Sequence, residues 1–492
     1  MRSTLALLAA IAVAGIVTLT ATASANAPKP RPGGGSFTNY SLGEATGTTC
    51  PGSSACSNIA AEPAIRADGA GRFFGSSENG LGGGTVAFRS TDGGLHYTTL
   101  VSPNSVSSAN DTGFAPGGGD TDLAVAPDKN SAGFYNVYVA SLSLANVDVS
   151  TSTDGGATWR LSPVTTPETI DDREWIAADT NDKVCISYHN APQGITVGCS
   201  PDAGLAFTQF APALDAAHAF QTSENSIGNL AIDPGSHTIY QTYSAITTAA
   251  ETACAPQLGV VAGTCNYHGV YMAVSTDGGA TFTDYPVYVN PDVTVGYGHQ
   301  FVNVSVDRAG NVYSVYTDDH HVYYSFSKDR GQTWSGPYLV STTSGTQIFP
   351  WSTAGDAGKL DVVYYDTPYF GTEHPDNYPA SAAWTVGFAQ NVNALTPGSA
   401  WSRQTASPIV HYGGVCESGV TCTGNRDLFD DFGVAASPTT GLASIIYSDD
   451  QFDPAGPNTS GCDATTTNTS SCDHTAVATQ TAGTGIFGGK KK

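Results

Sequence analysis

One eight-residue pattern occurs five times in this chain: serine, any residue, aspartate, any residue, glycine, two further residues and an aromatic residue. The clearest copy is Ser152-Thr-Asp-Gly-Gly-Ala-Thr-Trp159, and the others are Ser90–Tyr97, Ser200–Phe207, Ser275–Phe282 and Ser327–Trp334. One chance match is expected in roughly one of a hundred chains of this length. Five copies therefore indicate an internal repeat.

The chemistry of the octet is that of a tight turn. The aspartate side chain can accept hydrogen bonds from backbone N–H groups about two residues further on, and the serine offers a second local acceptor. The glycine adopts a positive φ at little steric cost. The aromatic residue then returns the chain to an apolar layer. Each octet is therefore predicted to be a hairpin loop held by its own side chains.

A second repeat runs out of phase with the octet and consists of two apolar strands joined by a short polar turn. The clearest copy is Phe301–Tyr316, and Trp175–Asp179 followed by Val184–Tyr188 is another. Alternation with period two, bounded by turn residues, predicts β-strands. Seven units begin near Glu62, Asp120, Asp172, Glu224, Phe301, Phe349 and Arg426.

Each unit reads as strand, turn, strand, third strand, octet and fourth strand. The sixth unit carries an incomplete octet that ends at Gly398–Trp401, and the seventh unit has no octet. In the seventh unit His474–Gln480 can supply the third strand, and the N-terminal segment Phe37–Leu42 can supply the fourth. We therefore predict an all-β fold, a single β-propeller of four-stranded blades over residues 37–482, with seven blades preferred and six as the alternative.

Composition supports this fold and excludes one class of partner. Of 492 residues, 40% are apolar and only 13% are charged, whereas 56 are glycine and 27 proline. That balance favours many strands joined by many turns. The net charge of −24 leaves no basic face for nucleic acid, so a nucleic-acid partner is not expected.

The N-terminus has the features of a secretory signal. Arg2 is followed by the apolar stretch Leu5–Leu19 and by Ala23-Ser-Ala25, so residues 1–25 are predicted to be a signal peptide, with cleavage after 27 as the alternative. Residues 26–36 are expected to be a disordered Pro/Gly leader and 483–492 a flexible basic tail. No second apolar run could span a bilayer, so we expect a secreted, extracellular chain without a membrane anchor.

Ten cysteines follow the signal, and an even number in an exported chain predicts disulfides. We predict pairing between neighbours in the sequence, which closes loops rather than joining domains. The predicted pairs are Cys50–Cys56, Cys185–Cys199, Cys254–Cys265, Cys416–Cys422 and Cys462–Cys472.

The octet resembles the Asp box, or bacterial neuraminidase repeat, and the chain resembles the sialidase-like superfamily of secreted bacterial β-propellers. The resemblance covers residues of about 60 to 450. It implies that the boxes join strands three and four on the face away from the active site, so Asp154 and its equivalents are expected to be structural. Asp-box propellers include sialidases, other glycosidases and non-catalytic proteins, and sialidase catalytic domains have six blades.

A sialidase uses three arginines to hold the substrate carboxylate, a tyrosine assisted by a glutamate as nucleophile, and an aspartate as acid/base. The family's first arginine belongs to an Arg-Ile-Pro sequence, whereas the matching stretch here is Ala61-Glu62-Pro63. The family's arginine and aspartate further on fall within Gly80–Gly84, which contains neither. The standard sialidase machinery is therefore not evident, and a glycosidase using two carboxylates remains a hypothesis.

The resemblance implies that function lies where first strands begin and second strands end, and ionisable residues are frequent there. The candidate catalytic residues are Asp172, Asp431, Glu62 and Glu224. The candidate substrate-binding residues are Arg173, Arg426, Asp122, Glu78, His189, His299, Asp318 and Asp366.

We predict a secreted glycoside hydrolase acting on an extracellular glycan or glycoprotein, with a non-catalytic carbohydrate- or protein-binding propeller as the alternative. A third reading is a cell-envelope assembly or stability factor. The protein is expected to be a monomer and to require no cofactor. No metal-ligand motif is evident, although His320-His321 beside Asp318-Asp319 could ligate a divalent ion and clustered carboxylates could hold a structural calcium.

Overall fold

The computed structural model describes most of the chain. The described residues are 31–32, 36–42, 62–79, 83–104, 117–143, 146–164, 171–190, 194–255, 265–416, 422, 426–451 and 474–488. The predicted signal peptide and the Cys50–Cys56 and Cys462–Cys472 pairs lie outside these residues. Within them no helix has the length and apolar character needed to cross a membrane.

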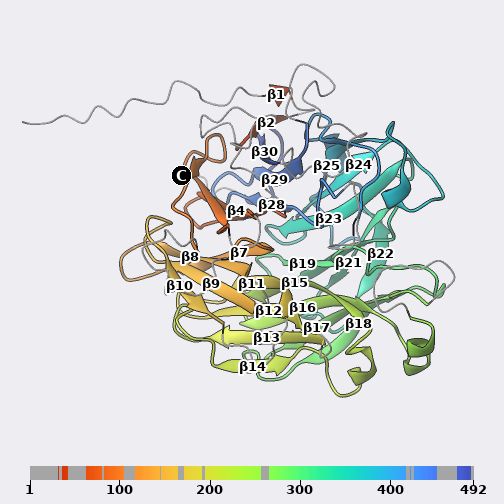
Figure 1. Cartoon of the computed structure of the whole chain (residues 1–492), viewed down its shortest axis with the longest axis horizontal. Coiled ribbons are helices and arrows are strands. Elements are labelled where there is room, and N and C mark those ends of the chain that lie inside the picture. Colours follow the sequence, from red (N-terminus) through yellow and green to blue (C-terminus); the bar gives the residue numbers. More distant parts are fainter. Residues whose placement is uncertain are drawn as a thin grey trace, which may run out of the picture.

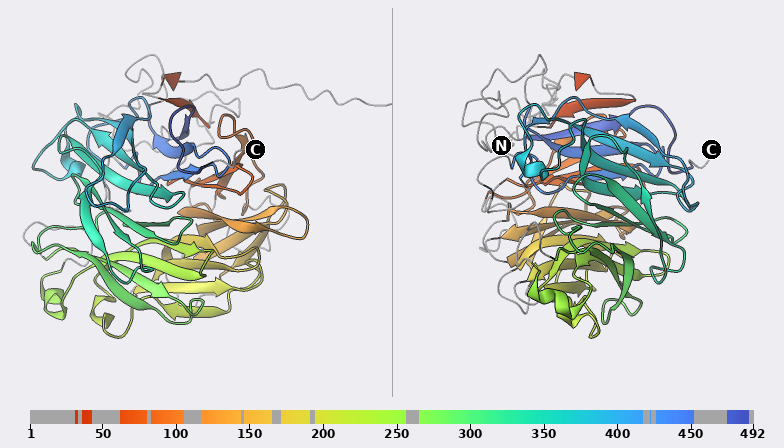
Figure 2. Two further views of the ribbon diagram at one scale, coloured as in Figure 1. Left: turned by 180° about the vertical axis from the view of Figure 1, so that it is seen from behind. Right: turned by 90° about the vertical axis from the view of Figure 1, so that its right-hand side faces the viewer.

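Seven antiparallel sheets surround one central axis, which confirms the seven-bladed propeller and rules out six blades (Figure 1). The view from behind shows the same ring, and the side view shows the molecule edge-on (Figure 2). Blades 1 to 5 each contain four strands in sequence order. Blade 6 carries an additional short strand paired to its third strand, and blade 7 has a fifth strand at its outer edge.

The strands of the first four blades run outwards from the central axis in chain order. Blade 1 comprises β3 (Ala64–Ala67), β4 (Phe73–Ser77), β5 (Val86–Ser90) and β6 (Thr98–Thr99), and blade 2 comprises β7 (Thr121–Lys129), β8 (Tyr135–Ser143), β9 (Asn146–Ser152) and β10 (Arg160–Pro163). Blade 3 comprises β11 (Asp171–Ala178), β12 (Val184–Asn190), β13 (Gly194–Ser200) and β14 (Gln209–Pro212), and blade 4 comprises β15 (Asn225–Asp233), β16 (Thr238–Ala245), β17 (Gly269–Ser275) and β18 (Thr283–Val289).

The remaining blades follow the same order until the ring closes. Blade 5 comprises β19 (Asn303–Val306), β20 (Val312–Thr317), β21 (Val322–Ser327) and β22 (Ser335–Leu339), and blade 6 comprises β23 (Thr346–Ala354), β24 (Leu360–Thr367), β25 (Ala383–Asn391), β26 (Ser402–Thr405) and β27 (His411–Tyr412). Blade 7 comprises β28 (Gly433–Ala436), β29 (Ala443–Asp449), β30 (His474–Gln480), β2 (Phe37–Ser41) and β1 (Arg31–Pro32). Short 3₁₀ helices interrupt three connections, namely η2 (Ala219–Gln221), η3 (Ala249–Ala253) and η4 (Pro375–Asn377).

The N-terminal strand closes the ring as predicted. β2 pairs antiparallel with β30, from Phe37 opposite Gln480 to Ser41 opposite Ala476. First and last parts of the chain therefore share blade 7, and the exposed edge of β30 is covered. At the other end of the chain Ile486 is buried and its N–H donates to the carbonyl of Gly441, so this part of the predicted tail packs against blade 7.

The five octets form the predicted turns between third and fourth strands. In the second blade the Ser152 hydroxyl donates to Asp154, and the N–H groups of Ala157 and Thr158 donate to Asp154 Oδ1 at 3.0 and 2.9 Å. Gly156 adopts a φ of +88° and donates its N–H to Ser152 Oγ. The equivalent bonds recur in the other four octets, so local side-chain acceptors shape each turn.

Antiparallel order places the octets and the turns between first and second strands on one face of the ring, which we call the box face. The opposite face carries the connections between blades and the loops between second and third strands, and we call it the mouth face. Inner strands of all seven blades line a central cavity of about 960 Å³. Its described lining residues include no acid, histidine or thiol, so this cavity offers no acid–base chemistry.

Three predicted disulfides lie within the described residues and are confirmed: Cys185–Cys199, Cys254–Cys265 and Cys416–Cys422. Cys185 and Cys199 face each other across β12 and β13. Disulfides of this kind fit an oxidising, extracellular type of environment.

Candidate functional site

Arg173 occupies the centre of the mouth face. Its guanidinium lies 4.3 Å from the ring centres of both Trp175 and Phe301. The Trp175 ring in turn lies 5.0 Å from that of Trp351. Because these aromatic residues come from blades 3, 5 and 6, their contacts cross the central axis and form a floor beneath the guanidinium.

Carboxylates from three other blades meet the same guanidinium. Nη2 lies 2.6 Å from Asp431 Oδ2, and Nη1 lies 3.5 Å from Asp120 Oδ2 and contacts Glu62. Glu62 also lies 3.5 Å from Arg426, which pairs with Asp430 at 2.9 Å. Residues 62 and 431 lie just ahead of first strands, and 120 directly precedes β7, so propeller topology brings them together.

We call this group, together with Glu78, the mouth cluster; its members are Glu62, Glu78, Asp120, Arg173, Arg426, Asp430 and Asp431. Glu78 follows β4, and its carboxylate, that of Glu62 and that of Asp120 each have an oxygen within 4.8 Å of the other two. Five acids therefore share two guanidinium groups. Carboxylates this close repel one another, which favours the protonated form of some of them unless a cation lies between them.

Burial raises the pKa of several of these acids. It raises the pKa of Glu62 well above its usual range, although Arg173 opposes the shift. Burial also raises the pKa of Glu78, and the neighbouring Asp120 adds to the shift. The pKa of Asp431 is raised to about 6 by burial, against the effect of Arg173.

Backbone geometry at two cluster positions is unusual for residues other than glycine. Glu62 has a φ of 46° and Arg173 a φ of 47°. The register of β11 against β12 shifts between Asp172 and Glu174, so Arg173 forms a bulge. Such conformations cost on the order of 1–3 kcal/mol each and are found most often at functional sites.

The bulge also orients two acids that flank Arg173. Asp172 lies on the exposed side of the bulge, and its Oδ1 accepts the N–H of Arg173. Its carboxyl still loses part of its hydration beside the mouth cluster, which, together with the charge of Asp120, raises its pKa. Glu174 is buried, neither of its carboxylate oxygens has a hydrogen-bond partner, and burial raises its pKa well above the usual range. Burial thus favours the protonated form of Glu174, a residue that sequence reasoning did not identify as a candidate.

Six of the twelve predicted site residues thus converge at the mouth: Glu62, Glu78, Asp172, Arg173, Arg426 and Asp431. His189 lies opposite Asp172 in the register of β11 and β12, and burial lowers its pKa. Asp120 and Asp430 complete the cluster without having been proposed as site residues. Both sit beside predicted strand starts, which is the one signal that could have identified them.

The other predicted site residues lie outside the mouth cluster and make structural contacts there. Asp122 is buried and joins blades, since it pairs with Arg66 at 3.0 Å and accepts the N–H of Ile176. Asp318 accepts the N–H groups of His320 and His321 and so caps its own loop.

Two further predicted residues lie in blades 5 and 6. Asp366 accepts from Gln347 at 2.8 Å, and burial raises its pKa. His299 contacts Asp319 and His374, so it belongs to a group apart from the mouth cluster.

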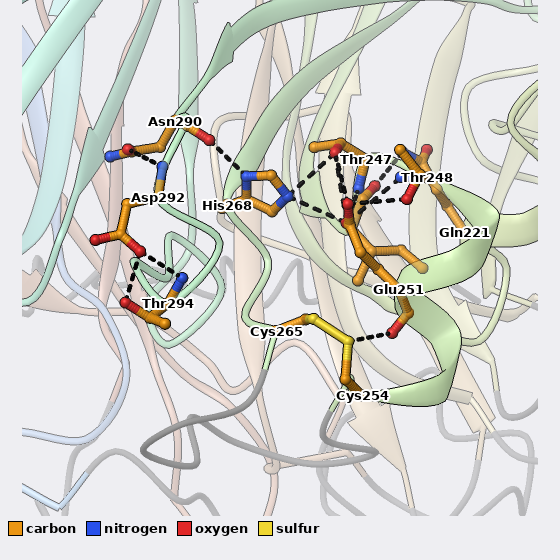
Figure 3. Close-up of polar contacts among 11 residues, drawn as sticks. Gln221, Thr247, Thr248, Glu251, Cys254, Cys265, His268, Asn290, Asp292 and Thr294 are labelled. Atoms are coloured by element: carbon orange, nitrogen blue, oxygen red, sulfur yellow. Dashed lines mark hydrogen bonds and ion pairs between the residues drawn. A yellow bond between two sulfur atoms is a disulfide. The ribbon is translucent and has the colours of Figure 1, made fainter.

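Glu224 lies in a separate polar group on blade 4. Burial raises its pKa, and its side chain is hydrogen-bonded to the hydroxyl of Tyr267. The adjacent His268 bridges two segments, with Nε2 3.1 Å from Glu251 and Nδ1 2.6 Å from the carbonyl of Asn290 (Figure 3). The Cys254–Cys265 disulfide closes this loop, so the group around His268 holds the blade-4 loop in shape.

The arginines do not form a pocket for a substrate carboxylate. Arg66 pairs with Asp122, Arg173 with acids from three blades, and Arg426 with Asp430. Each guanidinium is thus already matched by a carboxylate, and an incoming anion would meet net negative charge. Among the described residues, the geometry expected of the sialidase arginine triad is therefore absent.

A scan against models of known protein families finds no match, and a search of curated proteins finds none. Solved structures with a similar arrangement include a GH74 xyloglucanase from Xanthomonas campestris (13% identity, 78% of this chain, 50% of that chain, TM-score 0.46). They also include a GH93 α-L-arabinofuranosidase of Fusarium graminearum in complex with arabinobiose (13% identity, 62% of this chain, 88% of that chain, TM-score 0.41). A third is a mutant of the Aleuria aurantia lectin in complex with a fucosylated GlcNAc (10% identity, 73% of this chain, 97% of that chain, TM-score 0.39).

Proposed function

We propose that this protein is a secreted glycoside hydrolase that cleaves extracellular glycans with a pair of carboxyl groups in the mouth cluster. The observation that carries the proposal is the close approach of Glu62, Glu78 and Asp120, whose nearest oxygens lie within 4.8 Å of one another. Retaining glycosidases hold their two carboxyl groups about 5–5.5 Å apart, whereas inverting enzymes need about 6.5–9.5 Å. Glu78 and Asp120 share a hydrogen bond, so they lie closer together than either separation and a bound sugar would have to part them. Their closeness is nearer to the retaining arrangement, and we therefore write the proposal as a retaining mechanism.

Exposure separates the roles of the three acids. Glu62 is buried and contacts both Arg173 and Arg426, so it is a positioning residue. Glu78 and Asp120 are only partly buried and can meet a substrate. The proposal thus assigns the acid/base roles to these two residues and not to the predicted catalytic residues Glu62 and Asp431, which are buried against Arg173.

The raised pKa of Glu78 suits it to donate a proton to the glycosidic oxygen. Asp120 then attacks the anomeric carbon, the bond to the leaving group breaks, and a glycosyl-enzyme forms. Glu78, now ionised, accepts a proton from water as the water displaces Asp120. The products are a free sugar with retained configuration and the alcohol, and both carboxyl groups return to their starting state.

The test is a screen of the purified chain on aryl furanosides, aryl pyranosides and natural glycans, followed by Glu78→Gln and Asp120→Asn. Each variant should lose about 10²–10⁴-fold in kcat on any substrate that turns over. Asp366→Asn is the matched control, because Asp366 is a partly buried carboxyl of the same face outside the cluster. Full activity in both cluster variants would refute the assignment.

A second candidate, a non-catalytic glycan- or protein-binding propeller, is favoured by the ion pairs themselves. Arg173 contacts Glu62 and Asp431 over an aromatic floor, and such a network can simply close the channel. This candidate predicts glycan or protein binding without turnover. Calorimetry on the ligands retained in the screen separates the two functions.

A further inference from the structure

A second group of ionisable side chains gathers on the mouth face, outside the mouth cluster. His299 Nδ1 lies 3.2 Å from Asp319 Oδ2, and His374 Nε2 lies 3.4 Å from the same oxygen. The two ring nitrogens also contact each other. His299 precedes β19 in blade 5, Asp319 follows β20, and His374 lies beside η4 in the blade-6 loop, so three separate segments bring these atoms together.

Two of the three separations match those of ligands around a small metal ion, whereas the two histidine nitrogens lie closer together than such ligands do. Zinc binds histidine nitrogen and carboxylate oxygen at about 2.0–2.2 Å in a tetrahedral arrangement. The edge of such a tetrahedron is about 3.3 Å, which follows from those bond lengths. The two nitrogen–oxygen distances are close to that edge.

A carboxylate behind one histidine completes the pattern found around metal ions. Asp376 Oδ1 lies 3.2 Å from His374 Nδ1, on the side of the ring away from Asp319. The N–H of Asp376 donates to the same Nδ1, at 3.3 Å. Binding of a metal at Nε2 requires the other tautomer, in which Nδ1 carries the proton and donates to the Asp376 carboxylate.

Asp319 provides an independent observation. Its side chain is more than nine-tenths buried, and its Oδ1 has no hydrogen-bond partner. Its backbone is held at a φ of 71°, where its N–H donates to Thr317 Oγ1. A buried carboxylate oxygen without a donor is costly unless a cation is nearby.

We propose that His299, Asp319 and His374 bind one Zn²⁺. Two imidazoles and one carboxylate suit zinc and related first-row ions, whereas calcium prefers oxygen ligands alone. The site does not depend on the proposed glycosidase activity. It adjoins the mouth cluster through Phe301, which follows His299 by two residues and packs against Arg173.

The experiment uses the purified full chain, stripped with a chelator and titrated with ZnCl₂ in a calorimeter. Metal content after gel filtration gives the stoichiometry, which should be one zinc per chain. His299→Ala and His374→Ala should each weaken binding at least about 100-fold, and Asp376→Asn about 10–100-fold. Cobalt substitution should produce a visible absorption band in the wild type that is lost in both alanine variants.

Two control variants test whether zinc binds at other histidines instead. His320→Ala removes a neighbouring histidine that contacts the carbonyl of Gly371, and it should bind zinc as the wild type does. His218→Ala tests the Asp215–His218–Asp284 group, which could also hold a metal. Asp319→Asn preserves the shape of the site and serves if an alanine variant does not fold. Retention of zinc in both the His299 and His374 variants, or loss in His218→Ala instead, would overturn the proposal.

Discussion

Replacing Arg173 with methionine tests the charge balance of the mouth. The substitution keeps an unbranched apolar stem over Trp175 but removes the cation that faces Glu62 and Asp431. The side chains of these two acids are 0% and 8% exposed, so water cannot replace the lost partner. Breaking a buried ion pair from one side costs about 3–5 kcal/mol. We expect a loss of that size in the free energy of unfolding at pH 7.5.

The loss should depend on pH, and its direction follows from the pKa shifts. In the wild type, burial raises the pKa of Asp431 to about 6, above its ordinary value of 3.8, so its contribution to stability declines as pH rises from about 4 to 6. Arg173 opposes the upward shifts of both Asp431 and Glu62. Without it both pKa values rise further, and the decline extends to higher pH. At pH 5 both acids can bind protons, so the variant should lose only about 1–2 kcal/mol.

Urea unfolding, monitored by tryptophan fluorescence at pH 5.0 and 7.5, measures the loss in the free energy of unfolding and its dependence on pH. Arg426→Met is the matched control, because Arg426 is 20% exposed and approaches Glu62 only at 3.5 Å. For that variant we expect the free energy of unfolding to fall by about 1 kcal/mol, with little difference between the two pH values. Equal losses for Arg173→Met at the two pH values would refute the reasoning, as would a loss no larger than that of the control.

Three other predictions concern the frame around the mouth. Asp154→Ala removes the acceptor of one octet turn and should cost about 1–2 kcal/mol in denaturant unfolding while leaving any glycan turnover unchanged. Replacing Cys185 and Cys199 by alanine should cost about 3 kcal/mol by the same assay, because the bond closes a 14-residue separation. Burial raises the pKa of Asp361 to about 8, so Asp361→Asn should match the wild type in stability near pH 4 and exceed it at pH 8.

The fold could be predicted because its information is local. Each octet carries its own hydrogen-bond acceptors and a glycine where φ is positive, so the turns repeat without help from tertiary contacts. Alternation of apolar residues then identified the inner strands, and the need to cover the edge of β30 placed Phe37–Ser41 in blade 7.

The site could be predicted only in part, because its pairings depend on geometry that strand periodicity does not contain. Strict alternation would place Asp172 and Glu174 on one side of β11 and Arg173 on the other. The bulge at Arg173 breaks that rule and leaves Asp172 exposed and Glu174 buried. His374 lies in a long loop without any repeat, so its meeting with His299 follows from the folded blades alone.

Two features that lower the stability of the folded protein occur together at the mouth of this propeller. Acids with raised pKa values destabilise the folded protein at neutral pH, and Glu62 and Arg173 additionally adopt left-handed backbone conformations. Blade 5 shows that neither feature is needed to start an inner strand, since the described residues 299–303 that lead into β19 include no acid and no left-handed residue. A sequence selected for stability alone would replace such acids with apolar residues, because buried ion pairs are often less stable than well-packed hydrophobic ones. Their presence at one point, over an aromatic floor, is the reason we place the proposed binding or catalytic site at the mouth cluster.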